Sequence, residues 1–566
     1  MAGLLLPLHA PDALRVAIIA ENFLPKIDGS TITLAHLLQH MKSTGVRAML
    51  FGPESGMTEY EGCRLFGTFG VPLRVYPGLK INFISPAFIR ALRAFAPDVI
   101  HLVDPIWLGV QALAAIAVLF PGTPVVTSHH TNLPTYAAVF GYPYYHHRTW
   151  AVHAYLHSFA RYTLVPSAST AGLLAQKGFA NLRVCERGVD RGMFDPALRS
   201  PALRLAWGAA PTDTIILSVG RLSPEKNLAL LVEAFALLPP AARAHAKLVF
   251  VGDGPWDGEL RALCRERGVE AVFTGQLTGR ELGEAFASAD VMSSPSITET
   301  FGQVTLQGMA SGLPVVGLHV EGTADLVAHG ETGLLLDVHA AALAPSSNST
   351  SPSFNSAPPA FFSSAMSSAS SDTAFSDDEG DALLSPSDNG KGRATDTDEE
   401  EEWTPLTPLA PGTPVACFRS CAHLMRPGAR ALPSVAGRYA RLLAALVAAP
   451  DLRRAMGARA RKAAEGYEWE RCTARMVATY AECAGRAECG AGLTRVRSGA
   501  SDATRVGEDK EDAALAKDPE SAALLKLREV HARPVVDACV VVHALVAATL
   551  SHASYMVPAP ADLWGP

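Results

Sequence analysis

The feature that most constrains the fold is an alternation of short apolar runs with amphipathic stretches. It occurs twice, over residues 14–190 and 191–344. Apolar runs bounded by turn residues are typical of buried strands, and strands alternating with helices indicate parallel sheets covered on both faces. The predicted strands are Arg15–Ala20, Arg47–Phe51, Val99–Val103, Pro124–Ser128, Tyr162–Val165 and Arg183–Cys185, then Thr214–Val219, Lys247–Gly252, Ala271–Gly275, Val291–Pro295, Pro314–Gly317 and Gly333–Leu336.

Twelve strands are too many for one ordinary open sheet, so the sequence predicts an α/β protein with two Rossmann-like domains. Two helices are well marked between the strands. Ser85 and Pro86 provide an N-cap and a first-turn proline for a helix ending near Phe95, and Arg280–Ala289 carries an apolar stripe. Parallel sheets of this kind bind ligands beyond the carboxyl ends of their strands. We therefore expect a shared site in the cleft between the two domains.

The composition changes abruptly at residues 345–412, where Ser, Pro, Asp and Glu dominate. Such a segment buries too little apolar surface to offset the entropy of ordering it, so we predict a disordered insertion in the C-terminal half. Helical periodicity returns at 430–484, and residues 485–566 are predicted to form a loosely ordered tail. Residues 372–402 of this insertion hold twelve acidic residues against two basic ones, a charge of −10, which leaves the remainder slightly basic although the whole chain has a net charge of −7.

Composition excludes several classes of protein. Apolar residues form 48% of the chain and charged residues 18%, which excludes a wholly disordered protein. No basic face is required by the sequence, so we do not expect a nucleic-acid partner. The nine cysteines are scattered without CxxC pairs, which favours free thiols in a reducing compartment.

Neither end of the chain predicts a membrane span. The apolar N-terminus has no basic segment before it and breaks at Pro7, which is unlike a signal peptide. The apolar run Val535–Leu550 has sixteen residues and contains Asp537 and His543, whereas a span needs about 20 apolar residues. We expect a cytoplasmic protein, with peripheral contact to the cytosolic face of a membrane as the alternative.

In the N-terminal half, two strand ends carry candidate site residues. Gly29 follows the first strand and precedes a helix, so either its backbone approaches a ligand or it only permits the turn. His129 and His130 follow the fourth strand. Adjacent residues of a strand point in opposite directions, so only one of these histidines is expected to face the cleft.

In the C-terminal half, the candidate residues suit a nucleoside diphosphate. At the end of an apolar strand lie Gly220, Arg221 and Lys226. The forked guanidinium of an arginine and the compact ammonium of a lysine could together hold a diphosphate. Glu299 lies in a loop before the helix that opens at Phe301-Gly302. The alternatives are a solvated surface pair for the two cations and a helix-dipole role for the carboxylate.

Several motifs together resemble glycosyltransferase family 4. They are GRLSPEKN, VGDGP, ASADVMSSPSITETFGQVTLQGMASGLPVV and HGETGLL in the C-terminal half. The segment RGVDRGMFDP resembles the crossing between that family's two domains. PKIDGS and SHHTNLPTY resemble its subgroup of sulfoquinovosyl-diacylglycerol synthases and lipid-directed mannosyltransferases.

The resemblance implies a GT-B fold and a retaining, metal-independent transfer of a sugar from a nucleotide sugar, with no further cofactor. The acceptor would be a hydroxyl group, of a lipid in the subgroup. The implied donor-binding and catalytic residues are Gly220, Arg221, Lys226, Glu299, Phe301, Gly302 and Gln307 on the donor side and His130 opposite them, with Gly29 and Tyr136 on the acceptor side.

The chain departs from the family pattern at Gln307, where a second glutamate usually binds the nucleotide ribose. An amide still accepts a hydrogen bond but carries no charge, which puts the affinity for the donor in question. Two alternatives to a transferase therefore remain open at this point. They are a non-catalytic sugar-nucleotide-binding or scaffolding protein and a sugar-nucleotide epimerase.

Overall fold

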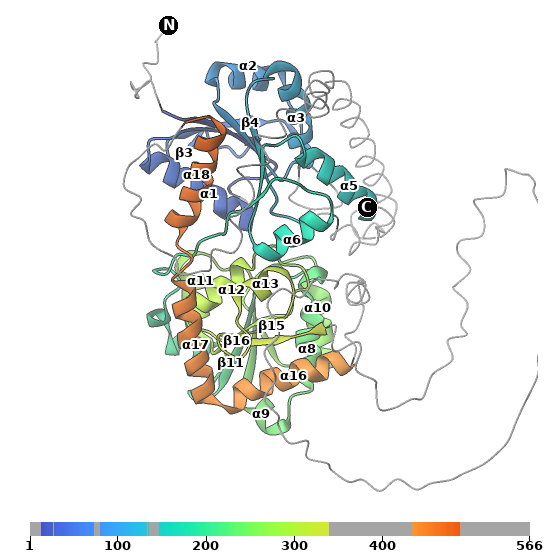
Figure 1. Cartoon of the computed structure of the whole chain (residues 1–566). Coiled ribbons are helices and arrows are strands. Elements are labelled where there is room, and N and C mark those ends of the chain that lie inside the picture. Colours follow the sequence, from blue (N-terminus) through green and yellow to red (C-terminus); the bar gives the residue numbers. More distant parts are fainter. Residues whose placement is uncertain are drawn as a thin grey trace, which may run out of the picture. The chain divides into compact units, whose positions relative to one another are not determined.

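The structure is a computed structural model of the 566-residue chain, and it describes residues 13–25, 28–72, 80–132, 134, 146–338 and 433–486. The predicted insertion at 345–412, Tyr136, and the apolar run Val535–Leu550 lie outside these ranges. The described residues form two large sheets with their helices, which we call the N-terminal and the C-terminal lobe, and a separate two-stranded sheet of β5 (Gly70–Pro72) and β6 (Lys80–Asn82) (Figure 1).

The N-terminal lobe contains an eight-stranded sheet of order β10-β9-β8-β7-β1-β2-β4-β3, parallel except for the β3–β4 pair. The alternating faces of its strands pack into two apolar clusters, one of which includes Ile18 and the other Ile19. The strands are β1 (Arg15–Ala20), β2 (Arg47–Pro53), β3 (Glu59–Tyr60), β4 (Cys63–Thr68), β7 (Val99–Val103), β8 (Val125–Ser128), β9 (Tyr162–Val165) and β10 (Leu182–Val184), and the helices are α1 (Gly29–Ser43), α2 (Pro86–Phe95), α3 (Leu108–Leu119), α5 (His146–His157) and α6 (Ala168–Gln176).

The C-terminal lobe contains a six-stranded, fully parallel sheet of order β13-β12-β11-β14-β15-β16. This is the doubly wound order, in which successive strands are added first on one side of β11 and then, from β14 onward, on the other side. The strands are β11 (Thr214–Val219), β12 (Ala246–Val251), β13 (Ala271–Phe273), β14 (Val291–Ser294), β15 (Val315–Leu318) and β16 (Gly333–Leu336), and the helices are α7 (Pro201–Ala206), α8 (Leu228–Ala236), α9 (Pro240–Ala244), α10 (Asp257–Glu266), α11 (Gly279–Ser288), α12 (Gln303–Ala310) and α13 (Glu321–Leu326).

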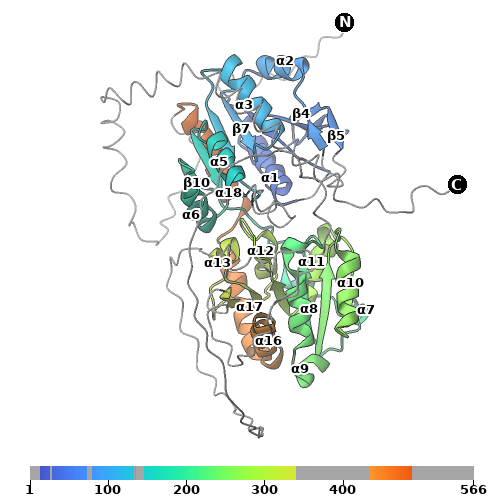
Figure 2. The same cartoon turned by 90° about the vertical axis from the view of Figure 1, so that its right-hand side faces the viewer.

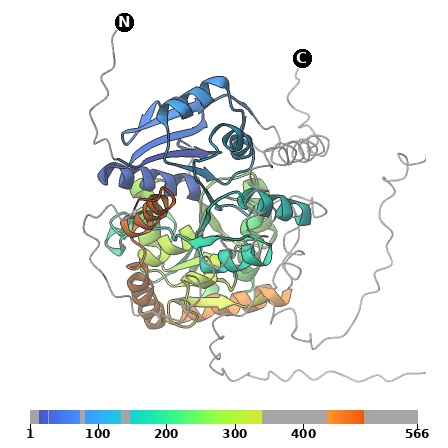
Figure 3. The same ribbon diagram turned by 45° about the horizontal axis from the view of Figure 1, so that its top comes forward.

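The last three helices are shared between the lobes. The helices α16 (Pro433–Ala448) and α17 (Pro450–Ala464) pack on the C-terminal lobe, with α16 beside α8 (Figure 2). The helix α18 (Trp469–Cys483) packs on the N-terminal lobe beside α1 (Figure 3). Tyr480 of α18 is fully buried there, and its hydroxyl lies 2.9 Å from His101 Nδ1. The chain therefore crosses between the lobes twice.

The two crossing segments, around residues 188–189 and 467–469, are in direct contact. The Val189 amide donates to the Tyr467 carbonyl at 2.8 Å, and a Cβ added to Gly188 would collide with the Trp469 backbone. Only glycine allows this approach. The residue just before this contact, Arg187, is therefore held at the junction of both lobes, and its surroundings are described with the site.

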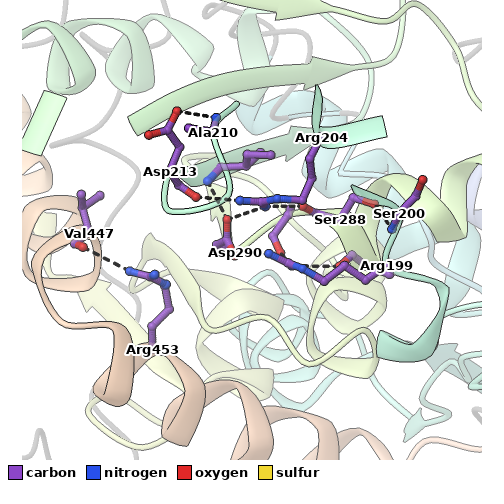
Figure 4. A network of polar contacts seen from close by, with 12 residues as sticks. Arg199, Ser200, Arg204, Ala210, Asp213, Ser288, Asp290, Val447 and Arg453 are labelled. Carbon is purple, nitrogen blue, oxygen red and sulfur yellow. Dashed lines mark hydrogen bonds and ion pairs between the residues drawn. The ribbon is translucent and has the colours of Figure 1, made fainter. Parts of the chain in front are cut away.

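A network of arginines and aspartates stabilises the start of the C-terminal lobe (Figure 4). Arg204 is buried and donates to Asp290 and to the Ser288 carbonyl, both at 2.8 Å. Asp290 also accepts from the Ile215 amide at 2.8 Å and from Arg199 at 2.7 Å. This network ties α7 to the strands β11 and β14. Its charges are paired with each other, as buried charges must be, and we assign it a structural role.

All twelve predicted strands are observed, with ends shifted by at most two residues. The helix from Pro86 to Phe95 begins at the predicted Ser85 cap, whose hydroxyl accepts from the Phe88 amide. The short strands β3, β4, β5 (Gly70–Pro72) and β6 (Lys80–Asn82) were not predicted. β3, β5 and β6 have only two or three residues each, and β4 contains neither a continuous apolar run nor a clean alternation.

Candidate functional site

A cavity lies where the order of the C-terminal sheet reverses. The carboxyl ends of β11 and β14 border it, which is the position at which doubly wound sheets bind ligands. The cavity contains four of the predicted donor-side residues. Its lining consists of Ser218, Val219, Gly220, Arg221, Leu222, Lys226, Leu228, Ser293, Ser294, Pro295, Ser296, Glu299 and Val304.

Lys226 and Glu299 form an ion pair in this cavity, with 2.5 Å between Lys226 Nζ and Glu299 Oε1. Their side chains are 24% and 18% exposed. Burial disfavours the lysine charge, but the attraction and hydrogen bond of Glu299 outweigh it, so the pKa of Lys226 lies above its ordinary value. Lys226 is thus held as a cation that suits phosphate oxygens, and Glu299 places its oxygens beside it, where sugar hydroxyls could donate to them.

The turn before α12 leaves the start of that helix open. Gly302 precedes the helix with φ +88°, a left-handed conformation that favours glycine, and no side chain caps the helix there. Phe301 is 2% exposed and packs edge-on against Tyr467 at 6.1 Å. Gln307 is buried within α12 and does not line the cavity around Arg221. The first amides of α12 are therefore oriented to attract an anion.

The Glu299 loop is held in place by Glu321 from the neighbouring turn. Glu321 has φ +39°, which is uncommon for a residue with a side chain, and its carboxylate accepts from the Glu299 amide at 2.8 Å. The same carboxylate accepts from Asn132 Nδ2 of the N-terminal lobe, at 3.2 Å to each oxygen. Burial raises the pKa of Glu321 to about 7. This contact links the loop to the opposite lobe.

The two histidines after β8 make different contacts. His129 is buried, lies among rings that include Trp150 and Phe179, and bonds Asn132 Oδ1 through Nε2 at 2.9 Å. At His130 it is the backbone carbonyl that reaches the other lobe, where it accepts from the Thr300 hydroxyl at 2.9 Å. The predicted placement of the His130 side chain in the cleft, and its role there, stay predictions.

Arg187 lies beside His130 and was not predicted as a site residue. It is 5% exposed, and its Nη2 lies 3.1 Å from His130 Nδ1. Its guanidinium is 6.0 Å from the centre of the Phe301 ring. Burial lowers the pKa of Arg187, whereas the charges of Asp104, Asp28 and Glu299 act in the opposite direction. Arg187 therefore joins residues of both lobes at one point.

Gly29 has a packing role that the sequence did not indicate. The first amides of α1, those of Ser30 and Thr31, bond Asp28 Oδ1 at 3.1 and 2.9 Å. A Cβ on Gly29 would collide with Arg187 Nη1. The glycine thus makes room for the buried arginine. The predicted contact of Gly29 with the acceptor stays a prediction, and Tyr136 lies outside the described residues.

Two family descriptions match this chain over the two lobes. Residues 27–192 match Glycosyltransferase Family 4, and residues 201–349 match Glycosyl transferases group 1. A GDP-mannose-dependent alpha-mannosyltransferase of Mycobacterium tuberculosis is 37% identical over 330 residues, which cover 57% of this chain and 84% of that protein. The chain belongs to glycosyltransferase family 4. This family 4 protein is thus a nucleotide-sugar-dependent glycosyltransferase, as the motifs predicted.

Further relatives and solved structures agree with this assignment. The Arabidopsis thaliana sulfoquinovosyl transferase is 32% identical over 346 residues, covering 58% of the family 4 chain and 66% of that protein. Anabaena HepE in complex with UDP covers 83% of this chain and all of its own, with 16% identity and a TM-score of 0.53. A sucrose-phosphate synthase of Thermosynechococcus elongatus gives a TM-score of 0.54 at 17% identity, covering 83% of this chain and 98% of that one. These structures confirm the predicted GT-B fold.

Three residues of the site escaped the sequence analysis of this family 4 chain: Arg187, Asp104 and Glu321. Asp104 directly follows β7, has φ +44° and accepts from the His130 amide at 2.6 Å. Its position after an apolar strand was a usable signal, since site residues gather at such ends. Arg187 and Glu321 had no comparable signal, because their burial depends on contacts between the lobes. Across the described residues, none of the helices combines the length and apolar character needed to cross a membrane.

Proposed function

We propose that this glycosyltransferase transfers a hexose with retention of anomeric configuration, without a divalent metal, from a nucleoside diphosphate donor to a hydroxyl group of a lipid or glycan. The observation that carries the proposal is the cavity at the ends of β11 and β14. It brings two cations, Arg221 and Lys226, together with the carboxylate of Glu299. A diphosphate and a sugar are the chemical groups that such a set of side chains would bind side by side.

The proposed chemistry depends on the charge that develops when the anomeric bond breaks. Negative charge appears on the leaving diphosphate, and Arg221, Lys226 and the open start of α12 would stabilise it. The Lys226–Glu299 pair would separate on binding, the ammonium turning to phosphate and the carboxylate to a sugar hydroxyl. The departing phosphate oxygen would take the proton of the acceptor on the same face of the sugar, which accounts for retention.

The relatives support one donor above others. The proteins from Mycobacterium tuberculosis and Mycolicibacterium smegmatis are GDP-mannose-dependent alpha-mannosyltransferases, each 37% identical to this chain. The plant relative is a sulfoquinovosyl transferase. We therefore propose GDP-mannose as the first donor to test. In the N-terminal lobe, His130 would contact the sugar, and Gly29 and Tyr136 would lie on the acceptor side.

A donor and acceptor screen tests this proposal. The full chain is incubated with labelled GDP-mannose, UDP-glucose and UDP-sulfoquinovose, each with and without a glycolipid extract and with and without EDTA. Lipid-linked label that persists in EDTA, with an α linkage by NMR, is the expected result. Donor binding without turnover would favour a scaffolding protein, and an isomerised donor without acceptor would favour an epimerase.

Membrane contact is a separate proposal. A transferase whose acceptor is a lipid has to reach that acceptor at a bilayer surface, which favours peripheral association with the cytosolic face. Co-sedimentation tests this association, with vesicles prepared from the lipid extract that serves as acceptor in the transfer assay. Recovery of the protein in the supernatant at low salt would contradict it.

A further inference from the structure

The hydrogen bond between Arg187 and His130 determines where the histidine carries its proton. A guanidinium has five N–H donors and no acceptor. The 3.1 Å contact of Arg187 Nη2 with His130 Nδ1 therefore requires that Nδ1 accept, and an accepting ring nitrogen carries no proton. In a neutral imidazole the proton is then on the other nitrogen, Nε2.

His130 is held in the neutral state by its surroundings. Burial lowers the pKa of His130 well below its ordinary value, and the positive charge of Arg187 lowers it further. Protonation would place a second N–H against the guanidinium. The charged and titratable groups around His130 are Arg187 of the crossing segment, His101 of β7, Asp104 just after β7 and His129 of the same strand end. The Glu299-Thr300 loop of the C-terminal lobe also contacts it, through the Thr300 hydroxyl.

The proton on Nε2 has no acceptor in the structure. Among the described residues, His130 Nε2 is buried and has no hydrogen-bond partner. An unsatisfied buried donor costs about 1–3 kcal/mol in general, so such groups are retained where a ligand completes them. The opposite lobe lies close by, because the Thr300 hydroxyl donates to the His130 carbonyl. A substrate oxygen between the lobes would satisfy this donor.

We propose that Arg187 is a positioning residue that fixes His130 as the Nε2–H tautomer, so that His130 donates a hydrogen bond to an oxygen of the bound substrate and does not act as a base. This inference rests on the proposed sugar transfer and assigns the direction of one contact within it. A base would need a lone pair on Nε2 and a proton on Nδ1. That arrangement would set two donors against each other at 3.1 Å from Arg187.

The first test is made on the free protein and needs no turnover. Histidine labelled with ¹⁵N reports the protonation of each ring nitrogen, and the His130 signals are those missing from His130→Gln. At neutral pH we expect a protonated Nε2 and an unprotonated Nδ1. A proton on Nδ1 would overturn the inference even if the protein transfers sugar, and a failed transfer assay would leave this result unaffected.

The second test uses Arg187→Met, which removes the donor while keeping a similar length, and Arg187→Lys, which retains a cationic donor. Without the guanidinium, Nδ1 becomes free to carry the proton, so we expect a tautomer mixture and a roughly three- to tenfold fall in kcat/KM near neutral pH. Arg187→Lys should retain the Nε2–H signal. Arg183→Met, the same change at an exposed ion pair with Glu482, is the matched control and should change neither signal nor rate.

The pH profile separates a donor from a base. Loss of Arg187 removes one cause of the lowered pKa of His130, so the imidazole of Arg187→Met protonates at higher pH than in the parent. The imidazolium has N–H groups on both nitrogens and recovers the Nε2 donor. Activity of Arg187→Met relative to the parent should therefore rise in acid. A fall in acid would indicate a base and overturn the proposal, and an unchanged tautomer with a raised KM would assign Arg187 to direct substrate contact instead.

Discussion

The turn from β1 to α1 and the turn from β14 to α12 have the same outline in sequence, an apolar strand, a glycine and a helix. In the structure they differ. Asp28 accepts from the amides of Ser30 and Thr31 and closes the start of α1, whereas no side chain caps α12. Gly29 makes room for Arg187, and Gly302 provides a left-handed backbone. The first turn is capped by its own side chain, whereas the start of α12 has no side-chain cap.

The two turns also differ in what holds them. Asp28 is part of its own turn and forms a reciprocal capping box with Thr31. The loop before α12 is held from outside by Glu321, which accepts from the Glu299 amide and from Asn132 of the other lobe. A locally capped turn keeps its geometry when the lobes separate. A turn held by a residue in contact with the other lobe is sensitive to their approach.

The largest expected effect is a loss of kcat on substitution near the α12 turn, compared with a loss of stability on substitution in the α1 turn. Lys226→Ala removes the cation next to Glu299 and should lower kcat by about 10²–10³-fold, the range seen when one charge-stabilising donor is lost. Asp28→Ala should instead cost about 1 kcal/mol of unfolding free energy through the lost cap. Steady-state kinetics and urea unfolding measure both variants. Lys462→Ala, an exposed lysine of α17, is the control. A kcat for Lys226→Ala within threefold of the parent would refute the diphosphate role.

A smaller effect comes from the residue that holds the open turn. The pKa of Glu321 is raised to about 7 by burial, so the native state binds an additional proton between about pH 4.5 and pH 7. Stability contributed by the neutral carboxyl is present below about pH 4.5 and is lost as the pH rises through 7. Glu321→Gln removes this titration. The variant should gain up to about 3 kcal/mol relative to the parent between pH 5 and pH 8, as followed by urea unfolding. A constant difference across that range would contradict this prediction.

The residues around the α12 turn could be predicted from the sequence more completely than those of the α1 turn. The strand ends, Arg221, Lys226 and Glu299 could be predicted because apolar runs mark the strands and charged residues follow them directly. The capping box of Asp28 and Thr31 was also readable, since an acceptor followed three residues later by a polar partner is a known signature.

Other features could not be read from local sequence. Arg187 looks like any polar residue of a connecting segment, and its burial follows from Gly29, Phe301 and the crossing at Trp469, which are distant in the chain. The same holds for Glu321, whose pKa is raised by burial and whose carboxylate accepts from Asn132 of the other lobe. Residues whose environment is created by contacts between lobes carry no periodic or spacing signal, whereas strands and helix starts do.

The two glycines themselves provide a third comparison. Gly302→Ala forces a side chain into a left-handed conformation, 3.1 Å from a Leu326 methyl carbon, and should cost about 1–2 kcal/mol of stability in any background. Gly29→Ala should cost stability only while Arg187 is present, because the collision is with its guanidinium. Urea unfolding of Gly29→Ala, Arg187→Met and the double variant measures this coupling. Additive effects would mean that Gly29 is required for a different reason.

The smallest expected effect concerns Gln307, which lies inside the helix that follows the open turn. Charged acceptors gain roughly 1.5–3 kcal/mol from a hydrogen bond and neutral ones about 0.5–1.5, so a glutamate in contact with a ribose hydroxyl should bind the donor about fivefold more tightly. Ribose contacts change little between ground and transition states, so Gln307→Glu should lower the donor KM and leave kcat nearly unchanged.

The neighbouring glutamine provides the matched control for this substitution. Gln303 lies one turn earlier on α12, and its Nε2 donates to the Gly188 carbonyl at 2.8 Å. Gln303→Glu would replace that donor with an acceptor and set two oxygens against each other, so it should weaken the crossing without improving donor affinity. Gln303 is 9% exposed and Gln307 is 8% exposed, so burying a new carboxylate should cost a similar free energy at either position. A tighter donor KM in Gln307→Glu alone would therefore reflect a specific acceptor at position 307, whereas equal changes in both variants would reflect only added negative charge on α12.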